Sequence, residues 1–224
     1  MNAIDIFFNA EVFRKSFPIL LRGLGNTLLL SITAIVLGTI GGVLICLMRL
    51  YAPRALRLLA VFYIDVLRAM PMLVVLILIY YALPFVGITL SSFAAAAVAL
   101  SIVMAAYTAE CVRAGIEAVP KGQFEAAQSL GLPFWRTMQK VILPQAVRLV
   151  IPPLASNSVS LVKDTSLASV VAMNDLLKQA TDSQALFANP TPLIGAAVIY
   201  VALLWPAVRL TSRLERRFGA PTHH

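Results

Sequence analysis

The stretch GLGNTLLLSITAIVLGTIGGVLICLM, residues 23–48, contains no charged side chain over its 26 residues. Arg22 and Arg49 border it. About 20 consecutive apolar residues are enough to cross the hydrocarbon core of a bilayer as an α-helix. The stretch therefore predicts a transmembrane helix over residues 23–48 and indicates an all-α integral membrane protein.

The composition of the whole chain agrees with this interpretation. Hydrophobic residues make up 60% of the 224 positions and charged residues 12%, against about 45–50% and about 25% in soluble domains. The apolar excess suffices for about five spans, which argues against a large secondary transporter in one chain. The net charge of +8 is explained by basic loops kept on the cytoplasmic side of a membrane, and no RNA-binding motif accompanies it. Nucleic acid is therefore excluded as a partner, and the lipid bilayer is the expected surroundings.

Four further apolar runs are long enough to be spans, so the chain is expected to form a single transmembrane domain over residues 1–224. Twelve Lys and Arg residues fall after the first span, after the third and in the C-terminal tail, whereas five fall on the opposite side. Because positively charged loops stay in the cytoplasm, the N-terminus is predicted outside and the C-terminus inside. The predicted spans cover approximately residues 23–48, 58–83, 91–112, 151–171 and 190–210.

Two features of the N-terminal part predict local arrangements. Residues 2–17 mix phenylalanines with charged side chains, which is typical of an amphipathic segment along the outer membrane interface. Gly38 and Gly42 form a GxxxG pattern that lets another helix approach closely. Packing within one subunit is favoured over a seam between two subunits.

The connection between the third and fourth spans, residues 113–148, is far longer than a turn between antiparallel helices. Pro120 can open a helix that Gly131 stops, and Pro133 can open a second short helix that Pro144 ends. Apolar residues of the second helix share one face. The segment therefore predicts two short amphipathic helices on the cytoplasmic face, which another protein can grip.

The residues within this connection carry a family pattern. EAAQSLG at 125–131 is followed after nine residues by VILP at 141–144, which resembles the EAA motif of ABC importer permeases, EAA-x3-G-x9-I-x-LP. Only Val141, in place of Ile, departs from the motif. The surrounding sequence, including YIDVLRAMP, LPQAVR and KDTSLASVV, resembles the polar amino acid permeases of the histidine, glutamine and glutamate type. The resemblance extends from about Gly23 to RLERRF at 213–218.

The resemblance implies a transmembrane subunit of an ATP-driven importer of polar amino acids, with the type I ABC importer fold, in the bacterial inner membrane. It implies two permease chains, identical or paralogous, a dimer of ATPase subunits and an extracytoplasmic binding protein. No GxxxxGK[ST] motif occurs, so the chain is expected to bind no cofactor itself and ATP to lie on the partner ATPase. The residues implied in ATPase coupling are Glu125, Ala126, Ala127, Gly131, Leu143 and Pro144.

Charged residues inside the fourth span suggest a pathway for substrate. A helix that starts after Pro152 and Pro153 would place Lys163 and Asp164 about 15 Å into the membrane. An α-amino acid needs a cation for its carboxylate and an acceptor for its ammonium group, which these two residues supply, with Asn157 on the same helix. An inter-helix ion pair that only stabilises the fold is an equal alternative.

Asp65 and Arg68 lie three residues apart in the second span, the spacing at which they pair on one helix face. A structural ion pair is favoured there over a gate or a substrate contact. Glu110 and Arg113 repeat the spacing at the end of the third span. Pro71 is expected to kink the second span.

Two other functional classes remain as alternatives. An ion-gradient-driven carrier or channel would use Lys163 and Asp164 as its ion site. An intramembrane enzyme is disfavoured, because the only histidines are His223 and His224 and no acidic cluster has metal-ligand spacing. The sequence therefore predicts a transport subunit without a catalytic or metal site.

Overall fold

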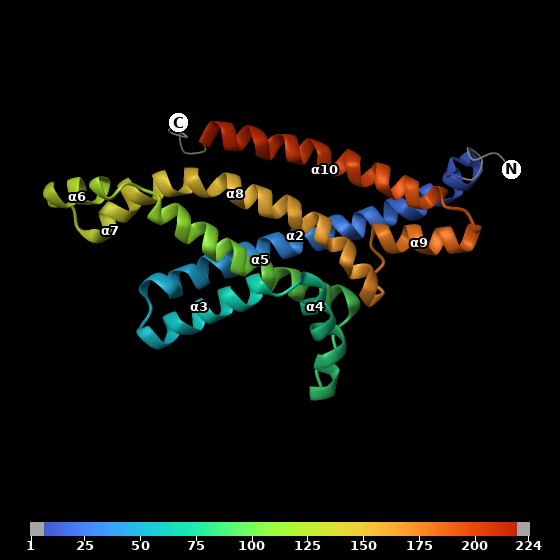
Figure 1. Cartoon of the computed structure of the whole chain (residues 1–224), viewed down its shortest axis with the longest axis horizontal. Coiled ribbons are helices and arrows are strands. Elements are labelled where there is room, and N and C mark those ends of the chain that lie inside the picture. The colour runs from blue at the N-terminus through green and yellow to red at the C-terminus, as the bar shows by residue number, and fades with distance from the viewer. Residues whose placement is uncertain (1–6, 219–224) are drawn as a thin grey trace.

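The computed structural model describes residues 7–218, and these residues form helices and connecting turns without any strand. The expected all-α class is confirmed. Most of the helices run along one common axis (Figure 1). The helices are α2 (Ala10–Tyr51), α3 (Arg54–Ala69), α4 (Met72–Ile77), α5 (Ser92–Glu117), α6 (Lys121–Ser129), α7 (Phe134–Thr137), α8 (Leu143–Asp164), α9 (Leu176–Phe187) and α10 (Thr191–Phe218).

The first span belongs to a helix much longer than the sequence predicts. The Asn9 side chain caps α2 by accepting hydrogen bonds from the N–H groups of Glu11 and Val12. The 42 residues of α2 extend about 63 Å, roughly twice the thickness of the hydrocarbon core. The prediction of a separate amphipathic segment is wrong for residues 10–17, which continue into the span, and residues 2–6 of that segment lie outside the described residues.

The centre of the molecule is the close contact between α2 and α5. A Cβ atom on Gly38 would lie 2.6 Å from Cβ of Met104, and one on Gly42 would lie 2.6 Å from the carbonyl oxygen of Ala105. Both distances are too short for a side chain, so the two glycines allow the helices to touch through their backbones. The prediction that the GxxxG pattern packs within one subunit is confirmed.

The second predicted span, residues 58–83, is not one helix. The chain bends by 108° between α3 and the segment Met72–Val86, and the latter projects sideways from the bundle (Figure 1). Pro71 causes the break, because a proline has no N–H to donate and forces the preceding Met70 into an extended conformation (ψ 135°). The break is therefore where the sequence predicts a kink, but the bend of 108° is much larger than a kink within one span.

The helix boundaries around the fourth span also differ from the prediction. Pro144 lies in the first turn of α8, where no backbone N–H is needed, and a π-helical turn over Met138–Ile142 joins α7 to α8. Pro152 and Pro153 lie inside α8. The predicted helix end at Pro144 and the predicted helix start after Pro152 and Pro153 are therefore wrong, because α8 begins at Leu143 and continues through Pro152 and Pro153. The fourth span over residues 151–171 stays a prediction.

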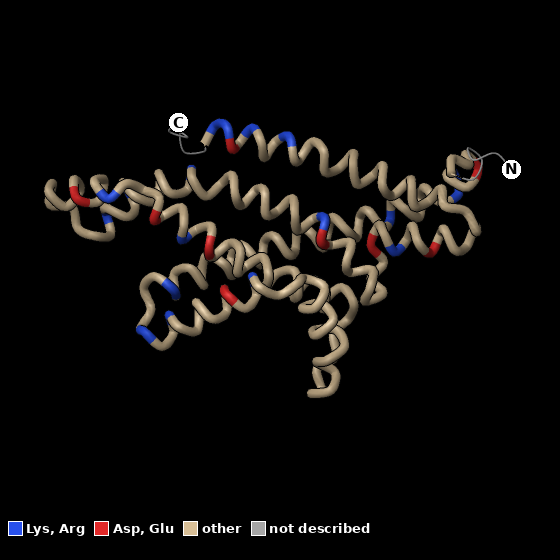
Figure 2. The backbone as a smooth tube through the Cα atoms, viewed as in Figure 1, with Lys and Arg blue, Asp and Glu red and all other residues tan. Residues whose placement is uncertain are grey.

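Three helices among the described residues, α2, α5 and α10, are long and apolar enough to cross a membrane, and the bent α3–α4 pair would make a fourth. The predicted count of five spans and the orientation of the termini stay predictions. The start of α2 and the end of α10 lie at opposite ends of the bundle, and α6 and α7 lie at the same end as the end of α10 (Figure 1). Most basic residues gather in that half (Figure 2), as the predicted orientation requires.

The N-terminus of α9, outside the predicted spans, contains a buried carboxylic acid. The Asp175 side chain accepts hydrogen bonds from the N–H groups of Lys178 at 2.9 Å and Leu177 at 3.3 Å. The next N–H, that of Leu176, donates to Oγ1 of Thr27 on α2 at 3.0 Å. Burial raises the pKa of Asp175 to about 6, because it disfavours the charged carboxylate more than these hydrogen bonds favour it.

This carboxyl predicts a pH dependence of stability. The pKa of Asp175 is about 6 in the fold and about 4 in an unfolded chain. The contribution of this carboxyl group to the free energy of unfolding is therefore lost as the pH rises from about 4 to 6. We expect the melting temperature in detergent to fall more between pH 4.5 and pH 7.5 for the original chain than for Asp175→Asn, which does not ionise. Equal falls for the two proteins would contradict this prediction.

Candidate functional site

The segment between α5 and α8 forms a small apolar cluster of its own at one end of the bundle. Val119, Met138, Ile142 and Ala146 are buried in it. Ala127, on the inner face of α6, is 4% exposed. The cluster fixes α6 and α7 onto the ends of α5 and α8, so the segment is a structured element, as the sequence predicts.

The outer surface of the segment has the exposure that a docking site needs. Glu125 and Ala126 are exposed on α6, and Gly131 ends that helix in the left-handed conformation at φ 69°, which glycine adopts without strain. Leu130 is 80% exposed and Trp135 is 65% exposed. Neither residue belongs to the EAA motif, but a large apolar side chain beside the helix stop is a signal of such a surface in the sequence.

Leu143 and Pro144 are exposed in the first turn of α8 rather than in the short helices. Gln145 connects the first turns of α8 to α6. Its Nε2 donates to the carbonyl of Val141 at 2.7 Å and to Oε1 of Gln123 on α6 at 3.4 Å. The six residues predicted for coupling therefore occupy one end of the molecule, with Ala127 alone turned inward.

Three aromatic rings tie the segment to the end of α2. The ring of Phe134 lies 6.2 Å from that of Tyr51 and 6.1 Å from that of Phe124, both edge-on. Such pairs stabilise by about 0.5–1.5 kcal/mol beyond the area they bury. The segment therefore packs against the end of α2 as well as against α8.

A cavity of about 220 Å³ lies between α4, α5 and α8. Asn157, Ser160 and Asp164 line it from α8, Tyr107 lines it from α5, and Met72 lines it from α4. The structure thus brings Asn157 and Asp164 together, whereas Lys163 is exposed and does not line the cavity. Neither Lys163 nor Asp164 forms an ion pair with any residue of the 7–218 range. Both the substrate contact and the stabilising inter-helix pair stay predictions.

A second cavity of about 630 Å³ lies between α5, α8 and α10, and Asn157 lines both cavities. Its polar lining includes Glu110 from α5 and Glu215 from α10. The Asn157 side chain, between the two cavities, donates to Sγ of Cys111 at 3.2 Å. Asn157 therefore lies between the first cavity and the second, which is nearer the coupling segment.

Glu110 is the centre of an ion cluster that links three helices. It accepts a hydrogen bond from Nη1 of Arg49 on α2 at 2.9 Å and is paired with Arg113 on its own helix. Nη1 of Arg68 on α3 lies 3.9 Å from the same carboxylate. The predicted Glu110–Arg113 pair is confirmed.

The predicted Asp65–Arg68 pair is wrong. Asp65 lies on the exposed face of α3, whereas Arg68 turns toward α5, where its guanidinium carbon lies 5.9 Å from the ring centre of Tyr107. The negative carboxylate of Glu110 and the ring face of Tyr107 outcompete the neighbour on the same helix. Since Tyr107 lines the first cavity, Arg68 lies beside that cavity.

Comparison with known proteins explains this arrangement. The family model of the binding-protein-dependent transport system inner membrane component matches residues 34–220. The chain belongs to this family. Permeases of the family include a probable amino-acid ABC transporter permease of Bacillus subtilis (strain 168), 39% identical over 96% of both chains. An arginine transport system permease of the same organism is 34% identical over 96% of this chain and 98% of its own.

Solved structures agree with the family assignment. The crystal structure of an amino acid ABC transporter with histidines superposes with a TM-score of 0.87 at 37% identity, over 92% of this chain and 96% of that one. An inward-facing methionine ABC transporter, MetNI, superposes with a TM-score of 0.72 at 22% identity, over 90% and 97%, which shows the shared fold. The chain therefore has the type I ABC importer permease fold and is an inner-membrane permease subunit of an ATP-driven importer.

Proposed function

We propose that this permease moves a polar amino acid across the bacterial inner membrane, driven by a separate ATPase dimer that binds the α6–α7 segment. A second permease chain, identical or paralogous, completes the pathway, and an extracytoplasmic binding protein delivers the substrate. ATP is bound by the ATPase subunits. The amino acid relatives at 34–39% identity support the substrate class.

The observation that carries the proposal is the continuity of α8. Its first turn contains Leu143 and Pro144, next to the coupling segment, and its last residue is Asp164, which lines the first cavity. The 22 residues of α8 span about 33 Å. A movement of the coupling segment by the ATPase therefore reaches the cavity through one continuous helix.

The exposed residues of α6 suit an ATPase as partner. Glu125 offers a charge to a basic side chain, and the small Ala126 permits close approach. Leu130 and Trp135 supply apolar area of the kind that anchors interfaces. Gly131 allows the sharp exit from the helix that keeps these side chains at the tip.

The first cavity supplies the groups that an amino acid needs. Asp164 accepts hydrogen bonds from an ammonium group, Asn157 adds a neutral donor and acceptor, and Arg68, next to Tyr107, offers a cation to a carboxylate. Lys163, the neighbour of Asp164 in the chain, is exposed and does not line the cavity. This arrangement favours a substrate that carries both charges over a simple ion.

Replacement of Asp164 tests this site. Because Asp164→Asn removes the negative partner of the ammonium group, we expect the KM for amino acid uptake to rise about tenfold or more, with normal insertion. Asp182→Asn is the matched control, since Asp182 is paired with Lys178 on the surface of α9. An unchanged KM in Asp164→Asn would show that the cavity does not bind the substrate.

The function itself is tested by uptake of labelled acidic, amide, cationic and aliphatic amino acids into cells with and without this chain. Loss of one class, dependent on ATP, is the expected result. Uptake driven by an ion gradient after ATP depletion would instead favour the alternative, a gradient-driven carrier or channel. Unchanged uptake of every class would contradict the amino acid assignment while leaving the family assignment intact.

A further inference from the structure

One face of α10 changes its chemistry along the helix. Val198, Val201 and Trp205 are exposed, the last of them by 62%, and the exposed Arg209, Arg213 and Arg216 follow. The spacing of three or four residues places all six side chains on one side of the helix. The order along this face, which we call the α10 face, is therefore apolar, then aromatic, then cationic.

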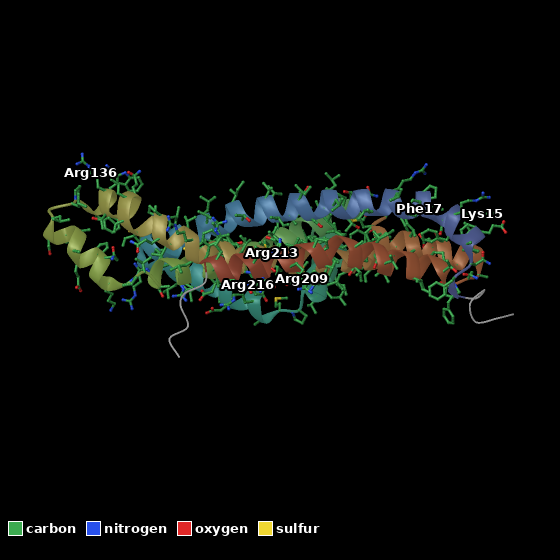
Figure 3. All side chains as sticks on the ribbon, turned by 90° about the horizontal axis from the view of Figure 1, so that it is seen from above. Lys15, Phe17, Arg136, Arg209, Arg213 and Arg216 are labelled. Carbon is green, nitrogen blue, oxygen red and sulfur yellow. The ribbon has the colours of Figure 1, made fainter. Side chains whose placement is uncertain are left out.

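The arginines of the α10 face have no acidic partner among the residues that the structure describes. Glu215, the one acidic residue of α10, accepts a hydrogen bond from Oγ of Ser156 on α8 at 3.1 Å and is thus turned toward the bundle. The guanidinium of Arg209 lies 5.6 Å from the ring centre of Trp205. Figure 3 shows Arg209, Arg213 and Arg216 together on the C-terminal half of α10, far from Lys15 and Phe17 at the other end.

This order matches the layers of a bilayer surface. Valines suit the hydrocarbon, tryptophan prefers the boundary with the headgroups, and arginines suit the anionic headgroups on the cytoplasmic side. Arg209 and Arg213 follow Trp205 by about 6 and 12 Å along the axis, and their long side chains can turn back toward the membrane. A surface for another protein would not need the valines and tryptophan in this order.

We propose that Arg209, Arg213 and Arg216 bind the phosphate of an anionic phospholipid in the cytoplasmic leaflet. The guanidinium fork donates two parallel hydrogen bonds to phosphate oxygens. The acyl chains of the same lipid lie along Val198 and Val201, so one molecule covers the cationic and the apolar part of the α10 face. This inference goes beyond amino acid transport and does not depend on the substrate.

Trp205 reports directly on this site. The chain has two tryptophans, and Trp135→Phe leaves Trp205 as the only one. The full chain with this change is placed in neutral phosphatidylcholine vesicles that contain a small fraction of brominated lipid, which quenches nearby tryptophan. We expect brominated phosphatidylglycerol to quench Trp205 about fivefold more effectively than brominated phosphatidylcholine, and this preference to fall at high salt.

Matched variants locate the preference. Changing Arg209, Arg213 and Arg216 to Gln removes three charges at the site and is expected to abolish the preference for phosphatidylglycerol. Changing Arg14, Lys15 and Arg22 to Gln removes the same charge at the opposite end and is expected to preserve it. Equal quenching by the two lipids in the chain with native arginines, or a preference that survives the first variant, would overturn the proposal.

Two further experiments distinguish a bound phospholipid from free phosphate and from a protein partner at the three arginines. Inorganic phosphate that abolishes the preference would show a site for free phosphate rather than for a lipid. ATPase subunits that abolish it would show that these arginines face a protein in the transporter. Either result would overturn the assignment to a phospholipid, and persistence of the preference in both arms supports it.

Discussion

A permease carrying Glu125→Lys and Gly131→Asp is expected to fold and insert normally and to lose at least about 30-fold of its ATP-driven uptake. Glu125 is exposed, so Glu125→Lys changes the stability of the isolated chain little. In the transporter, however, the new lysine would face the basic side chain of the ATPase that Glu125 is proposed to contact. Gly131 has φ 69°, a conformation that aspartate adopts less readily than glycine, so Gly131→Asp mildly strains the turn that presents α6. The measurement is uptake into vesicles that contain the complete transporter, beside the amount of inserted chain.

Gly87→Asp is the control for the effect of placing an aspartate in a left-handed backbone conformation. Gly87 also has a positive φ, 84°, and open space around it, but it lies in the connection before α5. We expect this variant to keep its uptake. Full uptake by the Glu125 and Gly131 variant would show that α6 does not couple the permease to ATP, whatever the ATPase contacts elsewhere.

The two ends of α6 were predictable from the sequence because they depend on local geometry. Pro120 fixes the backbone before the first turn, and Gly131 adopts the left-handed conformation after the last. The prolines of α8 were misjudged for the opposite reason. Pro144 is compatible with the first turn of α8, where no backbone N–H is needed. Whether Pro152 and Pro153 end a helix depends on neighbouring groups that replace the lost hydrogen bonds, and sequence spacing does not reveal these neighbours.

The partner of Arg68 illustrates the same limit. A spacing of three residues favours Asp65, yet the structure offers Glu110 and Tyr107 from another helix. By contrast, the shared face of Asn157 and Asp164 could have been read from the sequence, since seven residues are two helical turns. The depth and the positive charge of Lys163 favour grouping it with them, but its direction, about 100° from that of Asp164, leaves it outside the cavity lining.

Gly42→Ala is expected to be the most destabilising single methyl addition among the residues considered. The added Cβ would lie 2.6 Å from the carbonyl oxygen of Ala105, a backbone atom that cannot turn away. We expect a loss of about 1–3 kcal/mol, measured as a lower melting temperature in detergent. Gly41→Ala is the control, because its Cβ would lie 3.5 Å from Cβ of Ala105, an ordinary contact. Equal melting temperatures for the two variants would contradict the close packing of α2 on α5.

The combination of Gly38→Ala with Gly42→Ala tests how the two helices respond. A Cβ on Gly38 would lie 2.6 Å from Cβ of Met104, one turn away on the same contact. If α2 and α5 separate as rigid rods, the displacement that accommodates the first methyl group also accommodates the second, and the double variant loses less stability than the sum of the single variants. A loss equal to the sum would show that each site adjusts locally. Since α2 and α5 also hold Arg49 and Glu110 of the ion cluster, a rigid separation would weaken that pair too, and removing Arg49 should then cost less in the double variant than in the original chain.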